Sequence, residues 1–283
     1  MHQRPFKQVD VFTDQPYRGN PLAVVLDGTG LSTEAMQEFT NWTNLSEATF
    51  VLPPTPEGRA AGADYRVRIF CPGRELPFAG HPTLGTCHAW LEAGGQPQAA
   101  GRVVQECGVG LVTLRQGGER LAFAAPPLIQ GGPLDEDEVE RIARGLGLAR
   151  SDILHHAWCD NGPRWRGLML RSAQQVLALP VPRSEDLAGY EIGVVGPSRE
   201  PGIAFEVRAF FPGSHGLIED PVTGSLNAAL AQWLIGAGLA PGKYVASQGT
   251  CLARAGRVFV EQDGADIWIG GSSVTCVSGE VRL

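Results

Sequence analysis

The sequence contains a repeat whose spacing equals half of the chain length. The segment RIFCPG at 68–73 recurs as RAFFPG at 208–213, an offset of 140 residues in a chain of 283. Farther along, GHPTLGT at 80–86 matches EDPVTGS at 219–225, with the Pro, the Gly before the last residue and that last hydroxyl residue in register. Self-similarity at a fixed period indicates a duplicated structural unit. We therefore expect two copies of one fold.

Each copy combines strands with one helix that carries almost no charge. Apolar residues alternate with arginines at 65–69, a pattern typical of a half-buried strand. A Pro/Gly loop follows, and then the nearly uncharged segments PTLGTCHAWLEAGG (82–95) and PVTGSLNAALAQWLIGAGLAPG (221–242) predict one helix in each copy. A helix without a polar face has to be surrounded by other elements. The repeat therefore predicts a central, buried helix in each half.

The composition supplies short strands to surround these helices. The 37 Gly and 21 Pro indicate many turns, and 43% of the residues are hydrophobic, which is enough for two cores. The composition shifts around 124–138, and we place the linker there. We expect an α+β fold with similar halves at 1–127 and 128–283. Each half is predicted to be a curled, mostly antiparallel sheet or barrel wrapped around its central helix.

Charge and cysteine usage exclude several classes of partner. The net charge is −7 and the sequence contains no cluster of Lys and Arg, so no nucleic acid is expected as a partner. The uncharged segment 221–242 is long enough for a membrane span, but its Pro, Gly and polar residues favour a buried helix and no membrane. The six cysteines are scattered, and the first residues lack an apolar leader. We expect a cytoplasmic protein with reduced thiols.

The starts of the two predicted helices suggest a ligand site. A helix N-terminus presents unpaired N–H groups and partial positive charge, and therefore attracts anions. If the halves face each other, backbone N–H groups near Gly80, Gly224 and Ser225 could hold a small carboxylate-bearing substrate. The alternative interpretation is that both helices are simply well capped.

Four motifs resemble one protein family. GNPLAVV, NLSEATFV, ELPFAGHPTLGT and EDPVTGS occur in this order across most of the chain and are similar to motifs of the phenazine-biosynthesis PhzF-like family. The resemblance implies the diaminopimelate epimerase fold, with the active site in the cleft between two similar domains. It also implies a homodimer and an isomerase that uses no cofactor and no metal.

The resemblance also implies roles for individual residues. The Glu of NLSE is the family's proton carrier, and it corresponds to Glu47. His81 and Asp220 match the residues that flank the substrate. The positions around the substrate carboxylate and polar groups correspond to Ser46, Gly80, Gly224 and Ser225. A carboxyl group at the entrance of a buried strand, partly shielded from water, is suited to exchange a proton near neutral pH.

The chemistry has alternatives that the sequence leaves open. Related epimerases of this fold carry a Cys at each helix start, whereas this chain has Ala79 or Gly80 at one and Asp220 at the other, which disfavours a two-thiol racemase. A single carboxylate shuttle through Glu47 remains as the main hypothesis. A two-base epimerase that uses Glu47 and Asp220 is one alternative, and a non-catalytic small-molecule-binding protein on the same scaffold is another. His81 either orients Glu47, contacts the substrate or caps its helix, and Asp220 is equally suited to a capping role.

Overall fold

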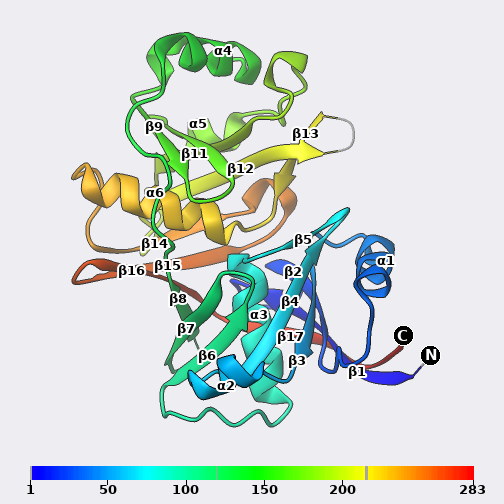
Figure 1. Ribbon diagram of the computed structural model, residues 1–283. Coiled ribbons are helices and arrows are strands. Elements are labelled where there is room, and N and C mark those ends of the chain that lie inside the picture. The colour runs from blue at the N-terminus through cyan, green and yellow to red at the C-terminus, as the bar shows by residue number, and fades with distance from the viewer. Residues whose placement is uncertain (1, 119, 214–215) are drawn as a thin grey trace. The chain divides into compact units, whose positions relative to one another are not determined.

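The computed structural model describes residues 2–118, 120–213 and 216–283 (Figure 1). The chain forms two compact units. The first consists of Met1–Ala124 together with Gly270–Leu283, and the second is Ala125–Ile269. Strands are numerous and helices are few, so the expected α+β class is confirmed.

The described residues of the first unit form three α-helices, and most of its strands lie before residue 125. Its helices are α1 (Thr33–Thr43), α2 (Pro56–Ala60) and α3 (Gly80–Glu92). Its strands are β1 (Gln3–Val11), β2 (Asn20–Val25), β3 (Ala48–Leu52), β4 (Tyr65–Cys71), β5 (Arg74–Leu76), β6 (Arg102–Cys107), β7 (Gly110–Gly117), β8 (Arg120–Ala124) and β17 (Ser273–Arg282).

The second unit repeats much of this arrangement, and its central helix has the same length as α3, 13 residues. Its helices are α4 (Glu136–Leu146), α5 (Ala173–Ala178) and α6 (Gly224–Gly236), with short 3-10 turns at Arg150–Asp152, Glu185–Leu187 and Thr250–Leu252. Its strands are β9 (His155–Asp160), β10 (Arg164–Met169), β11 (Glu191–Pro197), β12 (Phe205–Gly213), β13 (Gly216–Asp220), β14 (Lys243–Gln248) and β15 (Gly256–Asp263). Strand β16 (Asp266–Gly271) begins in this unit and ends in the first unit, because the boundary follows Ile269.

Strand pairing is the same in the two units. In the first, β2 and β3 are parallel, β3 pairs antiparallel with β4, β4 forms a hairpin with β5, and β4 lies parallel to β6. In the second, β10, β11, β12, β13 and β14 pair in the same order and directions. Parallel neighbours need a crossover connection, and α3 and α6 form part of the two crossovers. The sequence repeat is therefore a repeat of structure.

The two crossover helices are buried, as their lack of charge predicts. Every residue of α3 from Gly80 to Cys87 is buried, and so is every residue of α6 from Leu226 to Ala231. A side chain at Gly85 would place its Cβ 2.7 Å from atoms of Leu22 and Val11, so glycine allows α3 to approach β1 and β2 closely. None of the helices in the described part of the chain has the length and hydropathy needed to cross a bilayer.

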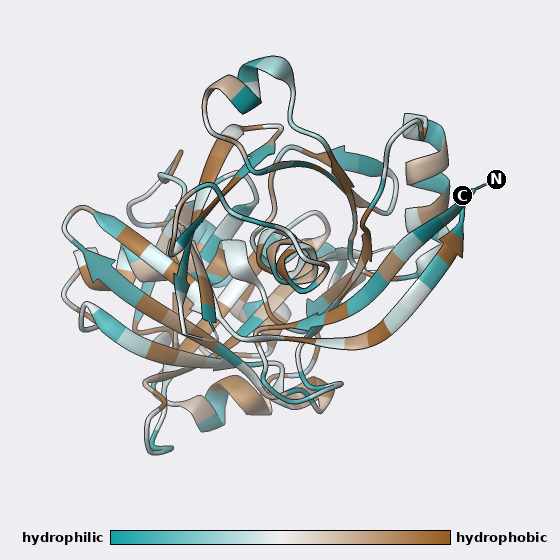
Figure 2. Ribbon diagram, turned by 90° about the horizontal axis from the view of Figure 1, so that it is seen from below, coloured by the Kyte–Doolittle hydropathy of each residue, from teal (hydrophilic) through white to brown (hydrophobic). Residues whose placement is uncertain are grey.

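The C-terminal strand lies with the first unit, which differs from the expected division at 127/128. Strand β17 pairs antiparallel with β1 along the whole of β1, from Gln3 opposite Arg282 to Val11 opposite Ser273. The chain ends therefore lie close together (Figure 1). Alternating hydrophobic and hydrophilic bands are visible along the strands near the N and C labels (Figure 2). The pairing partner of a terminal strand depends on tertiary structure, which the local sequence pattern does not encode.

Candidate active site

Glu47 stands at the point where a surface helix gives way to a buried strand. Helix α1 ends at Thr43, and Asn44 adopts the left-handed conformation (φ 57°) that terminates it. A two-residue turn then leads to Glu47, directly before the buried start of β3 at Ala48. The side chain of Glu47 retains 17% exposure. The carboxyl group is thus largely shielded from water but still accessible, which suits a group that has to contact a ligand.

His81 lies in the first turn of α3 and faces Glu47. Its Nε2 is 3.5 Å from Oε2 of Glu47, which is longer than an ordinary N–H···O hydrogen bond. On the other side of the ring, Nδ1 lies 3.5 Å from Nδ2 of Asn20, the first residue of β2. The imidazole is therefore held between a strand of the core and the candidate proton carrier.

Burial keeps the His81 ring neutral. Loss of hydration lowers the pKa of His81 to about 3, although a hydrogen bond with the backbone of Pro21 acts in the opposite direction. The contact with Glu47 is consequently not an ion pair at neutral pH. A neutral imidazole has one N–H donor and one acceptor nitrogen. Through its Nε2, it is able either to donate to a Glu47 carboxylate or to accept from a Glu47 carboxylic acid, depending on the tautomer.

Ser46 and Gly80 complete the residues expected in the first unit. Ser46 is half-buried in the turn before Glu47, and Gly80 is the buried first residue of α3. The N-cap residue of α3 is Ala79, which offers no side-chain acceptor, so His81 is not the N-cap. We call Ser46, Glu47, Gly80 and His81 the N-terminal half-site.

The second unit carries the equivalent group, which we call the C-terminal half-site: Asp220, Gly224 and Ser225. Asp220 is the buried last residue of β13, and its Oδ2 accepts a hydrogen bond from Oγ1 of Thr223. Thr223, and not Asp220, is the N-cap of α6, and its side chain does not cap the helix. Gly224 and Ser225 are the first two residues of that helix.

Two side chains orient Ser225. The sequence makes Trp165 a candidate for ring contacts with the substrate, but it predicts this role for neither residue. Trp165 donates from Nε1 to Oγ of Ser225 at 3.1 Å, and Asn161 donates from Nδ2 to the Ser225 carbonyl oxygen at 2.9 Å. An indole N–H is only a donor, so Ser225 Oγ is the acceptor and its own proton is left to be donated elsewhere. Both residues belong to the β9–β10 hairpin region, and no motif in the sequence marks them.

Burial holds several of the thiols in their protonated form. All six cysteines are free. Burial raises the pKa of Cys87, inside α3, to about 12, and burial also raises the pKa of Cys107 at the end of β6. No cysteine is the first residue of α3 or of α6. The expectation that thiols do not carry the chemistry is therefore consistent with their protonation.

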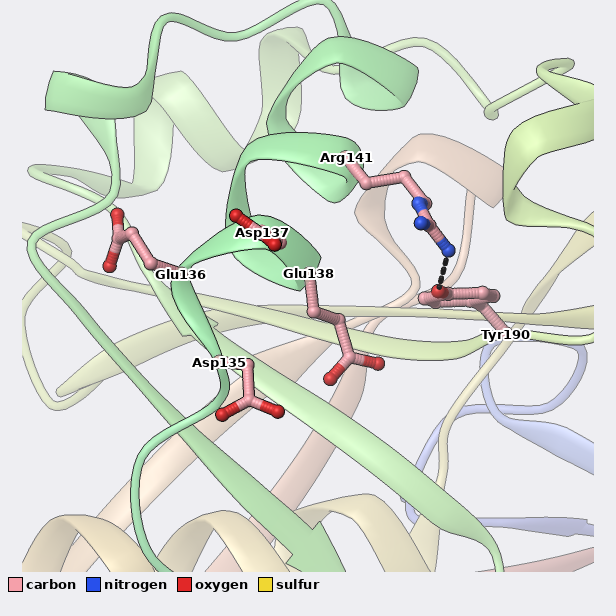
Figure 3. Close-up of a pocket in the computed structure, with 6 residues that line it drawn as sticks. All are labelled: Asp135, Glu136, Asp137, Glu138, Arg141 and Tyr190. Carbon is pink, nitrogen blue, oxygen red and sulfur yellow. Dashed lines mark hydrogen bonds between the residues drawn. The ribbon is translucent and has the colours of Figure 1, made fainter.

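Two surface cavities lie at other residues. One, of about 510 Å³, is lined by the acidic start of α4 with Arg141 and Tyr190, whose hydroxyl accepts from Nη1 of Arg141 at 3.1 Å (Figure 3). Two of its carboxylates already pair with arginines, Glu136 with Arg150 and Glu138 with Arg166. The other, of about 420 Å³, lies beside His88 and Glu92 in the first unit. Neither is lined by a residue of the half-sites, and the described residues contain no group of His, Cys, Asp and Glu suited to a metal ion.

Comparisons with known proteins agree with the repeat and the motifs. A family model described as phenazine biosynthesis-like protein (PhzC-PhzF) matches residues 9–279. Antisense-enhancing sequence 1 of Schizosaccharomyces pombe is 37% identical over 99% of both chains. The trans-2,3-dihydro-3-hydroxyanthranilate isomerase of Pseudomonas aeruginosa is 34% identical over 97% of this chain and 98% of its own.

A solved structure from the same family has a similar fold. A crystal structure of a PhzF-family phenazine biosynthesis protein from Enterococcus faecalis superposes with a TM-score of 0.81 at 24% identity, covering all of both chains. The family match extends over almost the whole sequence, and curated relatives of comparable length are isomerases. The chain therefore belongs to the phenazine biosynthesis-like (PhzF) family and is an isomerase.

Proposed function

We propose that this isomerase moves a proton within a small amino or hydroxy carboxylic acid, without a cofactor, and that Glu47 carries the proton. The observation that carries the proposal is the contact between Glu47 Oε2 and Nε2 of the neutral, buried His81. A carboxyl group that is partly shielded and has a neutral imidazole 3.5 Å away is equipped to hold a proton and to release it.

The reaction follows from having one carboxyl group on one side of the substrate. Glu47 takes a proton from one carbon and returns it to another carbon on the same face, so that the double bond moves and no net proton is gained. In the tautomer whose Nδ1 faces the amide nitrogen of Asn20 as an acceptor, Nε2 of His81 carries the ring proton and points it toward the Glu47 carboxylate. Proton transfer by a positioned side chain typically accelerates a reaction by about 10²–10⁴-fold.

The C-terminal half-site is suited to the carboxylate of the substrate. The first N–H groups of α6, at Gly224 and Ser225, lack a side-chain cap and carry the positive end of the helix dipole. The Ser225 hydroxyl adds a donor, because its oxygen already accepts from Trp165.

The substrate class is tested by a turnover screen. Because one relative is a trans-2,3-dihydro-3-hydroxyanthranilate isomerase, that compound is the first to assay, followed by cyclic and acyclic amino and hydroxy acids. Isomerisation of at least one of these acids, together with a thermal shift by the same acid, is the expected result. The absence of turnover and of any thermal shift across the series would contradict the proposal.

A two-base epimerase is the second candidate. The repeat aligns Asp220 of the C-terminal half-site with His81 of the N-terminal half-site. In that reaction Glu47 and Asp220 act on opposite faces of one carbon. Turnover in D2O separates the two: a single shuttle retains substrate-derived hydrogen in the product, whereas two bases on opposite faces introduce solvent deuterium at the inverted carbon.

We also propose that the protein is a cytoplasmic homodimer. The free cysteines support a reducing compartment. Light scattering after size-exclusion chromatography should give twice the chain mass of 30.1 kDa, and a mass of one chain would refute the dimer.

A further inference from the structure

Gln248 is the last residue of β14 and is fully buried below the start of α6. Its Oε1 accepts two hydrogen bonds, from the backbone N–H of Thr223 at 3.0 Å and from Nδ2 of Asn227 at 2.8 Å. Its Nε2 donates to the carbonyl oxygen of Asp220 at 3.2 Å and to Oγ1 of Thr223 at 2.9 Å. One amide thus connects the strand, the loop and the helix of the C-terminal half-site.

The orientation of this amide is fixed by backbone groups. The N–H of Thr223 is only a donor and the carbonyl of Asp220 is only an acceptor. Turning the Gln248 amide over would place oxygen against oxygen and N–H against N–H in a dry environment, which is strongly unfavourable.

The direction of the Thr223 hydroxyl follows from that orientation. Because Oγ1 of Thr223 accepts from Gln248, the single hydroxyl proton is available for Oδ2 of Asp220, which is its hydrogen-bond partner in the structure. A chain of two hydrogen bonds therefore runs from the buried amide to the Asp220 carboxylate. Members of such buried networks hold one another in a single geometry.

The fold itself does not require this network. In the parallel pairing of β4 with β6, Arg66 is opposite Glu106, and in that of β12 with β14, Glu206 is opposite Ser247. The repeat aligns Arg66 with Glu206, so Cys107 takes the place of Gln248 in the first unit. The first unit has its own buried amide two positions earlier, Gln105, whose Nε2 donates to Oγ1 of Thr83 at 3.1 Å and whose Oε1 accepts from the Tyr65 hydroxyl. In the second unit the amide instead binds the loop and the helix start, and its chain of hydrogen bonds ends on the Asp220 carboxylate, which indicates a task connected with that carboxylate.

We propose that Gln248 and Thr223 are positioning residues that hold the Asp220 carboxylate in its working orientation. The inference rests on the proposed function of the half-sites. It assigns no contact with the substrate to either residue. Gln248 fixes the Thr223 hydroxyl, and this hydroxyl in turn binds one oxygen of Asp220.

The test compares Thr223→Val, which removes the hydroxyl at nearly constant shape, with Thr223→Ser, which keeps it. For an acid that the wild type isomerises, we expect Thr223→Val to lower kcat by about 10-fold, the equivalent of one hydrogen bond to a charged group, with KM within about threefold. Thr223→Ser should restore kcat to within about threefold of the wild type.

A second readout does not depend on activity. The carboxyl carbon of Asp220 is followed by ¹³C NMR in both variants between pH 2 and 8. A hydrogen bond to the charged form favours that form, so the titration midpoint should lie about half a pH unit or more higher in Thr223→Val than in Thr223→Ser. Every charged neighbour of Asp220 is the same in the two proteins.

Equal midpoints in the two variants, or equal kcat values, would overturn the positioning role. A wild type that turns over none of the acids would instead count against the proposed function, and the NMR comparison would still decide the role of Thr223. If Thr223→Val does not fold, Thr223→Ala supplies the same comparison.

Discussion

Oε2 of Glu47 lies 3.5 Å from Nε2 of His81, although one residue follows a surface helix and the other begins a core helix. The strand order of the first unit brings the two together, because β3 is next to β2 and α3 packs on both. The partner of a half-buried carboxyl group is thus an imidazole that burial keeps uncharged.

His81 should make the protein less stable in acid. Its pKa is about 3 in the folded protein and near 6.5 when unfolded, so the unfolded chain binds the extra proton first. The associated stability is complete above pH 6.5 and is lost as the pH falls toward 3. In urea unfolding, moving from pH 7 to pH 5 should cost the wild type about 2 kcal/mol more than it costs His81→Gln. The same loss in both proteins would show that this histidine is not held neutral.

The two repeats provide a matched pair of arginines with different burial. Arg208 and Glu219 are each 2% exposed, whereas Arg68 and Glu75 are 19% and 38% exposed. Arg208→Met leaves a buried carboxylate without its partner and should lower the free energy of unfolding by about 3–5 kcal/mol.

The control for Arg208 is the same substitution in the first unit. Arg68→Met removes a pair that water screens and should cost less than about 1 kcal/mol. The measurement is the urea midpoint of both variants at pH 7. Equal costs for the two substitutions would contradict the burial that distinguishes the pairs.

Trp165 should act on the substrate carboxylate through Ser225. Trp165→Phe removes the indole donor that directs the Ser225 hydroxyl, and Ser225→Ala removes the hydroxyl itself. Each variant should raise KM by about 5–10-fold, the equivalent of one hydrogen bond, with kcat nearly unchanged. The double variant should be no worse than Ser225→Ala alone. Effects that multiply in the double variant would mean that Trp165 acts independently of Ser225.

The sequence predicted the architecture well because the architecture depends on repeated patterns. The offset between the two arginine-containing strands, and the two nearly uncharged helices after them, predicted two units with central helices, which the strand pairings confirm. The segment ATFVL was expected as a strand directly after Glu47, and it forms β3. These features are encoded locally by residue periodicity.

Features that depend on tertiary contacts could not be predicted. No motif marks Gln248 in the sequence. Its role depends on hydrogen bonds to Thr223 and Asp220, which become neighbours of β14 only in the folded protein. The sequence does not distinguish Trp165 from the other tryptophans, because its role depends on the hydrogen bond from its indole N–H to Ser225. The pairing of β17 with β1 joins the two ends of the chain, and neither strand carries a mark of its partner. The roles assigned to the half-site residues remain predictions.

The most direct test of the account is the turnover of Glu47→Gln, which keeps the size and the hydrogen-bonding capacity of the side chain but removes its ability to carry a proton. With an acid that the wild type isomerises, kcat should fall by about 10³-fold. The thermal shift that the same acid produces should be retained, which shows that the ligand still binds. A Glu47→Gln protein that turns over within about threefold of the wild type would contradict the assignment of Glu47 as the proton carrier.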